Sequence, residues 1–405
     1  MHELIMIHIY GQDKPGLASE LTGILAQYEV EILDMGQTVI HDNLSLGILI
    51  RIPSEHEAAP IVKEVLFAAH DLDINVKFRP ISDERYTDWV AFAGKKRYIV
   101  TLLGKRITAR HMAEVTKALA ENDLNIDGIT RLSGRMPLSD MEKAGKPSCV
   151  ELSVRGNPSD LEPIRKEFLK ITARLGIDIA LQEDTPYRRN RRMVCFDMDS
   201  TLIQAEVIDE LAKEAGVGEE VAAITESAMR GELDFQESLR RRLSLLEGLS
   251  EESMNTVAER IPLTDGAERL IANLRQFGYK TAILSGGFTY FGKILQKKLG
   301  VDYVYANELE IKEGKLTGGV VGDIVDAAKK AELLQMLAEQ EEINLQQVIA
   351  VGDGANDLPM LNLAGLGIAF HAKPKVKEGA RQSISTLGLD SILYLVGVRD
   401  RDTLI

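Results

Sequence analysis

The chain has 405 residues, with 48 lysines and arginines against 62 aspartates and glutamates, so its formal net charge is −14. This length suggests roughly two to four domains, and the acidic balance argues against a nucleic-acid binder, which needs a basic face. Two cysteines, Cys149 and Cys195, exclude a disulfide framework. We expect a cytoplasmic protein without membrane contact, because no apolar run reaches the roughly 18 residues of a membrane helix and no basic leader begins the chain.

The first half of the chain contains one order of predicted elements twice. In the first copy the order is strand, helix, strand, strand, helix, strand, over residues 3–10, 17–25, 32–40, 44–52, 60–69 and 74–78. The second copy repeats it over residues 97–103, 109–121, 124–132, 148–155, 159–175 and 177–182. Because an internal repeat defines the architecture, we predict two βαββαβ, ferredoxin-like modules over 1–82 and 95–184, joined by a linker at 82–94.

The turn before the first predicted helix has the sequence Asp13-Lys14-Pro15-Gly16. Gly16 permits a close backbone approach, and the helix N-terminus that follows attracts a carboxylate. A plain helix start with proline in its first turn is the alternative. With this turn, the modules resemble ACT domains, small regulatory modules that bind amino acids and commonly pair edge to edge. The second copy departs from the pattern with Gly-Lys-Arg-Ile-Thr at 104–108. This departure counts against ligand binding by the second copy and leaves packing as its role.

A basic run, Tyr-Arg-Arg-Asn-Arg-Arg, occupies residues 187–192 after the second module. It has neither interleaved aromatic residues nor a second basic cluster beside it, as a nucleic-acid site would have. We interpret it as a solvated face of a linker.

From residue 193 onward, predicted strands alternate with helices, which is typical of a parallel sheet covered on both faces. The strands are expected at 193–196, 279–284, 303–312, 315–321, 348–351 and 365–370. Helical periodicity between 202 and 249 interrupts the alternation after the first strand, and such an insert can fold over a site as a lid. We predict a Rossmann-like, three-layer α/β domain over 185–405, with a helical cap over about 206–262.

Polar side chains with reactive chemistry follow these strands. They are Asp197 and Asp199, Ser285 with Gly286 and Gly287, Lys330 on a helix, and Asp353 with Asn356 and Asp357. Ligands of open α/β sheets bind beyond the carboxyl ends of the strands, so we expect these residues to share one crevice. Two carboxylates as close as Asp197 and Asp199 repel each other unless a cation or a shared proton separates them. This pattern leaves open a divalent metal site, acid/base chemistry, or both.

In this order the motifs resemble the four motifs of the haloacid dehalogenase superfamily, over about residues 190–395. The resemblance implies an Mg²⁺-dependent phosphomonoesterase in which Asp197 is the nucleophile and Asp199 the general acid and base. It implies that Asp197, Asp353 and the main-chain carbonyl of Asp199 hold the metal. Asp357 would hold a metal-bound water or Lys330.

The remaining motif residues are then matched to the phosphate. Ser285 and the N–H groups of Gly286 and Gly287 would bind phosphoryl oxygens, and Asn356 belongs to the same substrate-binding set. Lys330 would add a fixed positive charge; its neighbour Lys329 is the rival, and the family spacing to Asp353 favours Lys330.

The resemblance is greatest to the members that hydrolyse O-phospho-L-serine. It matches Glu206 to the acid that binds the ammonium group and Arg242 to the arginine that binds the carboxylate. Met229 and Phe235 match apolar residues of the lid. The ordinary alternatives are a helix-start charge for Glu206, a solvated arginine run for Arg242, and lid core for Met229 and Phe235.

We therefore expect hydrolysis of O-phospho-L-serine, the last step of serine biosynthesis. The product, L-serine, would act as effector at Asp13, Lys14, Pro15 and Gly16, and the ACT-like modules imply a homodimer. One alternative is a phosphatase or phosphotransferase for another small phosphorylated metabolite. The other is an amino-acid sensor with a vestigial catalytic half.

Overall fold

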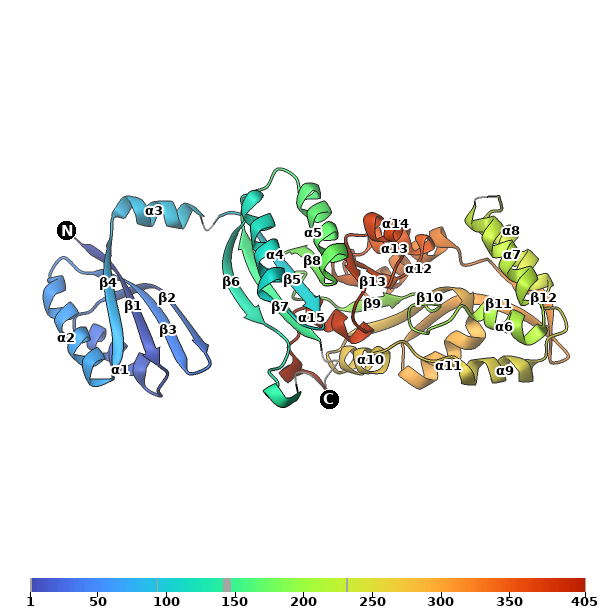
Figure 1. Ribbon diagram of the computed structural model, residues 1–405, viewed down its shortest axis with the longest axis horizontal. Helices are drawn as coiled ribbons and strands as arrows, with labels where there is room; N and C mark the ends of the chain where they lie inside the picture. Colours follow the sequence, from blue (N-terminus) through green and yellow to red (C-terminus); the bar gives the residue numbers. More distant parts are fainter. Residues whose placement is uncertain (1, 93, 141–146, 231, 405) are drawn as a thin grey trace. The chain divides into compact units, whose positions relative to one another are not determined.

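The computed structural model describes residues 2–92, 94–140, 147–230 and 232–404. The chain divides into two compact units, Met1–Lys95 and Lys96–Ile405 (Figure 1). Within the described ranges, none of the helices combines the length and the apolar character needed to cross a membrane.

The first unit is a βαββαβ module with an antiparallel sheet in the order β2-β3-β1-β4. Its elements are β1 (Glu3–Gln12), α1 (Leu17–Ala26), β2 (Glu31–Ile40), β3 (Asn43–Ile52), α2 (Ala58–Asp71) and β4 (Ile74–Ile81). Alternate residues of β1, such as Ile5 and Ile7, pack with Leu21 of α1 and Val65 of α2 in one apolar core. The period-2 pattern of the strands thus places both helices on one face of the sheet.

The segment expected to be only a linker contains a helix, α3 (Asp83–Phe92). The Ser82 hydroxyl accepts a hydrogen bond from the Arg85 N–H at 3.3 Å, as a helix-capping residue does. Asp83 and Glu84 then place negative charge in the first turn, where the helix dipole favours it. The helix has no strongly apolar face, so periodicity alone did not reveal it.

The second unit begins with the predicted second module, whose sheet has the order β6-β7-β5-β8. Its elements are β5 (Arg97–Gly104), α4 (Ala109–Glu121), β6 (Asn125–Arg131), β7 (Ser148–Arg155), α5 (Glu162–Leu175) and β8 (Asp178–Glu183). Val115 of α4 and Phe168 of α5 pack against Val100 of β5, so both helices again cover one face (Figure 1). The prediction of two βαββαβ modules is confirmed.

The α/β domain that follows is built on a sheet in the order β12-β11-β10-β9-β13-β14-β15, parallel except for β12. Its strands are β9 (Met193–Phe196), β10 (Lys280–Phe288), β11 (Tyr303–Lys312), β12 (Lys315–Val321), β13 (Val348–Gly352), β14 (Leu366–Phe370) and β15 (Gln382–Ile384). The central strand β9 is buried on both faces, which explains its continuous apolar run.

Helices cover the two faces of this sheet, as expected for three layers. Val194 and Phe196 of β9 pack in the same core as the helices α10 (Ala267–Gln276), α11 (Thr289–Leu299) and α15 (Ile392–Leu395). Met193 and Cys195 face the opposite side, with α12 (Ala327–Gln340) and α13 (Leu358–Leu363); a shorter helix, α14 (Pro374–Gly379), follows β14.

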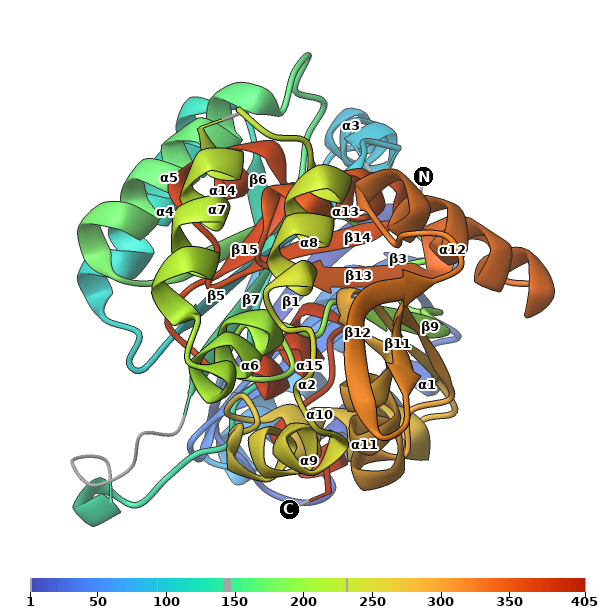
Figure 2. The same cartoon turned by 90° about the vertical axis from the view of Figure 1, so that its right-hand side faces the viewer.

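The predicted cap is a set of helices that comes after β9 in the chain. They are α6 (Val207–Ala215), α7 (Gly218–Met229), α8 (Phe235–Ser244) and α9 (Glu251–Arg260). In Figure 2, α6, α7 and α8 face the viewer, and α9 lies below them. Leu211 of α6, Leu239 of α8 and Val257 of α9 are buried in a core that continues into the sheet. The cap is therefore packed onto the α/β domain.

The basic run at 187–192 is not simply a solvated face. Arg188 is 4% exposed and donates to Glu151 of the second module at 2.5 Å, and Arg191 is 8% exposed. Arg191 donates to the carbonyls of Gln346 and Gly365 in the α/β domain. Arg188 thus ties the junction to the second module, and Arg191 ties it to the α/β domain that follows. A sequence pattern alone cannot distinguish such a buried junction from a solvated one.

Candidate active site

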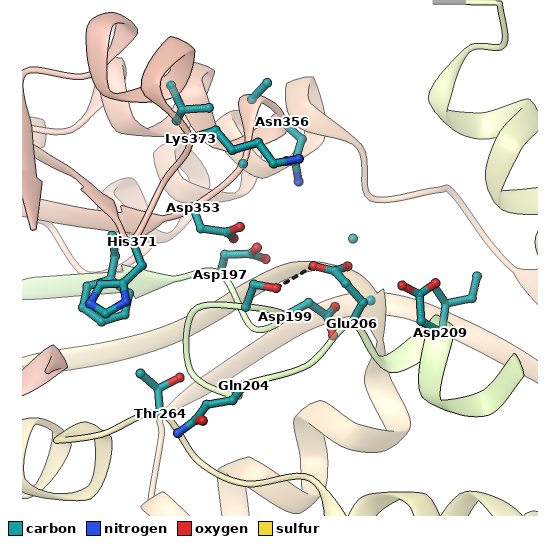
Figure 3. Close-up of a pocket in the computed structure, with 18 of the residues that line it drawn as sticks. Asp197, Asp199, Gln204, Glu206, Asp209, Thr264, Asp353, Asn356, His371 and Lys373 are labelled. Carbon is teal, nitrogen blue, oxygen red and sulfur yellow. Dashed lines mark hydrogen bonds between the residues drawn. The ribbon is translucent and has the colours of Figure 1, made fainter. Parts of the chain in front are cut away.

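Asp197 lies at the carboxyl end of the central strand, as predicted. Its N–H continues the ladder by donating to the Val351 carbonyl at 2.8 Å, and the residue is 5% exposed. Because β9 pairs with β10 and β13, their ends bring Ser285 and Asp353 beside it. Figure 3 shows the carboxylates of Asp197 and Asp353 turned toward the same cleft.

Asp199 returns to this cleft after a tight turn. Ser200 has a positive φ of 55°, and the Asp199 Oδ1 accepts a hydrogen bond from the Val207 N–H at 2.9 Å, at the start of α6. The Ser285 hydroxyl donates to the Asp199 Oδ2 at 3.5 Å. The carboxylate is thereby fixed between the cap and the end of β10.

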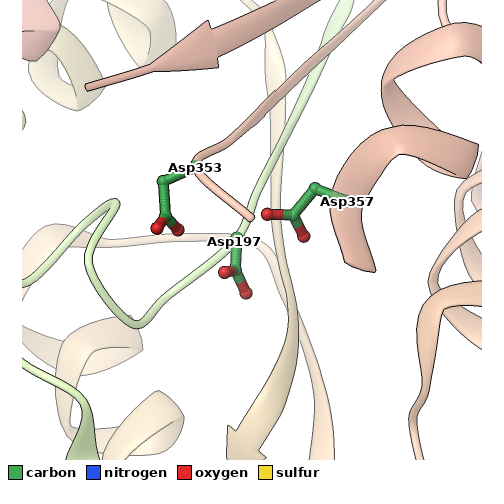
Figure 4. Close-up of side chains that lie close together, drawn as sticks. All are labelled: Asp197, Asp353 and Asp357. Carbon is green, nitrogen blue, oxygen red and sulfur yellow. The ribbon is translucent and has the colours of Figure 1, made fainter. Parts of the chain in front are cut away.

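Three carboxylates converge at the centre of the site (Figure 4). Asp197, Asp353 and Asp357 each offer one oxygen, and these oxygens all lie within 4.8 Å of one another. Lys330, fully buried on α12, donates to Asp197 Oδ1 and to Asp357 Oδ1, each at 2.7 Å. Asp357 Oδ2 also accepts the Gly354 N–H at 2.9 Å, so both of its oxygens are engaged.

Burial and repulsion between carboxylates disfavour the negatively charged forms of Asp197, Asp199 and Asp353. Burial and the Asp357 carboxylate raise the pKa of Asp197 well above its usual value. Burial and Glu206 raise the pKa of Asp199 to about 7, and burial, Asp357 and Glu206 raise that of Asp353 to about 7. This oxygen-only donor set, with its excess of carboxylates, fits Mg²⁺.

Lys330 remains a cation in this setting. Burial by itself lowers the pKa of its ammonium group, but the carboxylates of Asp197 and Asp357 outweigh burial, so the net shift is upward. Lys329, the rival considered above, instead pairs with Glu332 at 2.7 Å on the outer side of α12. The structure therefore brings Lys330 and not Lys329 to the acidic centre.

Gly286 and Gly287, near the carboxyl end of β10, allow a close approach to the acids. A Cβ atom on Gly287 would lie 2.2 Å from the Asp199 Oδ2, closer than any real contact, so a side chain there would displace the carboxylate. The Gly287 N–H donates to the Ser285 hydroxyl oxygen at 2.9 Å. Gly286 faces Phe235, whose Cζ would be 3.1 Å from a Cβ at that position.

A cavity of about 1570 Å³ opens from the acids toward the cap. Glu206, at the start of α6, faces it and accepts a hydrogen bond from the Ser200 hydroxyl at 2.8 Å (Figure 3). Arg242 lines it from α8, where its Nε donates to the Ser238 carbonyl at 3.3 Å and its Nη1 to the Thr225 hydroxyl at 3.5 Å. Burial lowers the pKa of Arg242, whereas its acidic neighbours act against this shift.

Most of the predicted site residues share this cavity, and some residues of the cavity were not predicted. Phe235 and Asn356 line it, whereas the side chain of Met229 lies outside the described part of the chain. Sequence reasoning missed Asp209 on α6 and Lys373 after β14. Figure 3 shows Lys373 and Asn356 reaching toward the cleft from the side opposite Asp199. The place of Lys373 just beyond a strand end was a usable signal.

The predicted effector residues form one exposed turn of the first unit. The Asp13 N–H donates to the Asp42 carbonyl at 2.7 Å, and Lys14 Nζ donates to the Leu72 carbonyl at 3.0 Å. Gly16 has a φ of 96°, which favours glycine, and directly precedes α1. Asp13, Lys14, Pro15 and Gly16 thus lie together at a helix N-terminus.

Comparison with known protein families finds matches for the α/β domain and for both βαββαβ modules. A family profile described as haloacid dehalogenase-like hydrolase matches residues 194–362, and two ACT-domain profiles match residues 3–79 and 97–182. The chain is thus a haloacid dehalogenase-like hydrolase that carries two ACT domains.

Individual proteins similar to this chain identify a family within this class of hydrolases. The phosphoserine phosphatase of Streptomyces coelicolor is 40% identical over 395 residues, which cover 97% of this chain and 92% of the relative. That of Mycobacterium tuberculosis is also 40% identical over 395 residues, covering 97% and 93%. A crystal structure of a probable phosphoserine phosphatase from Vibrio cholerae, unliganded, is 39% identical, with a TM-score of 0.59 over 74% of this chain and 86% of that one. The chain belongs to the phosphoserine phosphatase family and is a phosphoric monoester hydrolase.

Proposed function

We propose that this enzyme hydrolyses O-phospho-L-serine to L-serine and phosphate through an aspartyl-phosphate on Asp197. The observation that carries the proposal is one cavity that Asp197, Asp199 and Asp353 line together with Glu206 and Arg242. Lys330 is bonded to Asp197 and completes a buried acid–lysine centre beside this cavity. The acid–lysine centre suits phosphoryl transfer. A carboxylate and a guanidinium beside it suit the ammonium and carboxylate groups of the serine moiety.

In the first half-reaction, Asp197 attacks phosphorus and the bond between phosphorus and the serine oxygen breaks. Asp199 gives its proton to the leaving alkoxide, and its pKa of about 7 suits a group that must carry a proton at neutral pH and later accept one. Ser285 and the N–H groups of Gly286 and Gly287 bind the phosphoryl oxygens, and Lys330 offsets their charge.

In the second half-reaction, Asp199 takes a proton from water, which attacks phosphorus. The bond between phosphorus and Asp197 then breaks, which releases phosphate and restores the carboxylate. Asp197, Asp353 and the main-chain carbonyl of Asp199 would hold Mg²⁺. Asp357 would stay outside its ligand set and hold Lys330, from which it accepts a hydrogen bond. When bound, Mg²⁺ neutralises charge on the phosphoryl oxygens.

Phosphate release from O-phospho-L-serine tests the proposed reaction. We expect turnover with Mg²⁺, loss of turnover with excess EDTA, and recovery when Mg²⁺ is returned, because the acidic cluster needs a cation to bind an anionic substrate. The assay includes a panel of other phosphomonoesters. Turnover of several of these but not of phosphoserine would reject the substrate and keep the chemistry; no turnover of any ester would reject both.

Arg242→Ala tests recognition of the substrate carboxylate. We expect kcat/KM for phosphoserine to fall about 100-fold, because a partly buried, charge-assisted contact is lost. For O-phosphoethanolamine, which lacks the carboxylate, the change should stay within about threefold. Arg241→Ala is the matched control, because Arg241 is 55% exposed and pairs with Glu237 on the outer side of α8. An equal loss on both substrates would remove the amino-acid assignment.

We also propose that L-serine binds the first ACT domain at Asp13, Lys14, Pro15 and Gly16 and alters activity. The N-terminus of α1 supports this, because no side chain of the described residues caps it, and the first N–H groups of a helix suit a carboxylate. Titration calorimetry of the full chain should detect serine binding, weakened about tenfold by Asp13→Ala. Absence of binding heat in the unmodified protein would contradict the proposal. The homodimer, the cytoplasmic location and the domain boundaries at 82, 95 and 185 stay predictions.

A further inference from the structure

Asp178 is a buried acid that the proposed mechanism does not use. It begins β8 of the second ACT domain, and it is 0% exposed. Its Oδ2 accepts hydrogen bonds from the N–H groups of Ser385 at 2.9 Å and Thr386 at 3.0 Å, and from the Thr386 hydroxyl at 2.8 Å. Burying a carboxylate is costly unless it is bonded, and Oδ1 has no hydrogen-bond partner among the described residues, so the three bonds to Oδ2 are those that hold this one. Here the bonds go to a loop of the catalytic domain, directly after β15.

That loop forms a wall of the active-site cavity. Thr386, Leu387 and Gly388 line the same cavity as Asp197 and Asp199. The carbonyl of Leu387 accepts a hydrogen bond from His371 Nε2 at 2.9 Å, and the His371 N–H donates to the Ile384 carbonyl at 2.7 Å. His371 also lines the cavity, two residues before Lys373. A continuous set of contacts therefore runs from Asp178 to the residues that face the acids.

The second ACT domain itself reaches the cavity beside Asp178. Leu103 lies opposite Asp178 in the β5–β8 ladder, and the next turn, 104–108, contributes Lys105 to the cavity wall. This turn corresponds to Asp13–Gly16 of the first copy. In the second copy, the turn that corresponds to the predicted effector turn thus forms part of the wall of the active-site cavity.

The two domains are also joined away from the cavity. The Gln382 side chain accepts the Leu181 N–H at 2.9 Å and donates to the Leu181 carbonyl at 2.6 Å. Gln182 donates to the Leu395 carbonyl at 2.8 Å. Ala180 of β8 shares an apolar core with residues of the catalytic domain, such as Leu395. The contact of Gln182 with Leu395 therefore supports docking of the two domains without touching the cavity wall.

We propose that Asp178 is a positioning residue for the phosphatase reaction. Its carboxylate fixes the loop 385–388, and through Leu387 also His371, as one wall of the substrate cavity. The second ACT domain thus completes the catalytic site instead of serving as a separate ligand-binding module. This inference rests on the proposed function, because its kinetic readout is the turnover of phosphoserine.

The test compares Asp178→Ala, Asp178→Asn and Gln182→Ala in the full chain. Asp178→Ala leaves three donors without their acceptor, so we expect the KM for phosphoserine to rise about tenfold while kcat changes by less than about threefold. Asp178→Asn keeps an acceptor oxygen and should stay within about threefold of the unmodified enzyme. Gln182→Ala weakens the interface elsewhere and should leave KM unchanged.

Hydrogen exchange provides a readout that does not depend on substrate. The amides of Ser385 and Thr386 should exchange faster in Asp178→Ala, and not in Gln182→Ala, because only the first variant releases them. A KM that is unchanged in Asp178→Ala would overturn the inference, as would equal effects of Asp178→Ala and Gln182→Ala on KM and exchange. If the unmodified enzyme fails to hydrolyse phosphoserine, the proposed function fails, whereas the exchange experiment still decides whether Asp178 holds the loop.

Discussion

Asp197→Asn is expected to lower kcat for phosphoserine on the order of 10⁴-fold or more, because an amide cannot form the acyl-phosphate. The substitution preserves shape, and an amide oxygen can still accept the hydrogen bond from Lys330. The loss should therefore appear without a large change in folding. The measurement is phosphate release under saturating substrate and Mg²⁺, with the thermal midpoint recorded in parallel.

A second measurement separates the nucleophile from its neighbours. Enzyme quenched in acid after mixing with phosphoserine labelled on phosphorus should carry label when unmodified and none as Asp197→Asn. Asp199→Asn is the matched control: it removes the acid and base but leaves the nucleophile, so we expect slow turnover with detectable label. Label on the Asp197→Asn protein, or turnover close to that of the unmodified enzyme, would show that another residue attacks.

The positions of the acidic residues of the site could be predicted because their signal is local. A buried strand ends where an apolar run meets a polar residue, as at Phe196 and Asp197, and the carboxyl ends of parallel strands meet at one edge of the sheet. The choice of Lys330 over Lys329 needed family spacing, because adjacent helical residues point in directions about 100° apart. The structure shows why the choice matters, since Lys330 is buried and Lys329 is not.

The contacts between domains could not be read in the same way. Asp178 and Thr386 are separated by 208 positions, and Arg191 and Gln346 by 155. Pairing over such distances depends on the arrangement of whole domains, which periodicity and motifs do not encode. A single aspartate at a strand start, or an arginine in a basic run, therefore has the same sequence pattern whether it is buried or solvated.

Lys330→Met is expected to reduce kcat on the order of 10³-fold and to destabilise the fold. The ammonium group lies 2.7 Å from both Asp197 and Asp357, and all three residues are buried. Its removal leaves two carboxylates without their partner, and breaking a buried pair in this way costs about 3–5 kcal/mol. Phosphate release measures the loss of kcat. The urea-unfolding transition of the second unit measures the loss of stability.

Lys329→Met is the matched control for this variant, because it removes the same charge one residue away. Lys329 pairs with Glu332 on the outer side of α12, and exposed pairs contribute roughly 0–1 kcal/mol. We therefore expect activity within about threefold of the unmodified enzyme and almost unchanged unfolding. Equal losses from the two substitutions would mean that the positive field of α12 matters and the contact of Lys330 with Asp197 does not. Loss in Lys330→Met alone would assign the charge to the buried lysine.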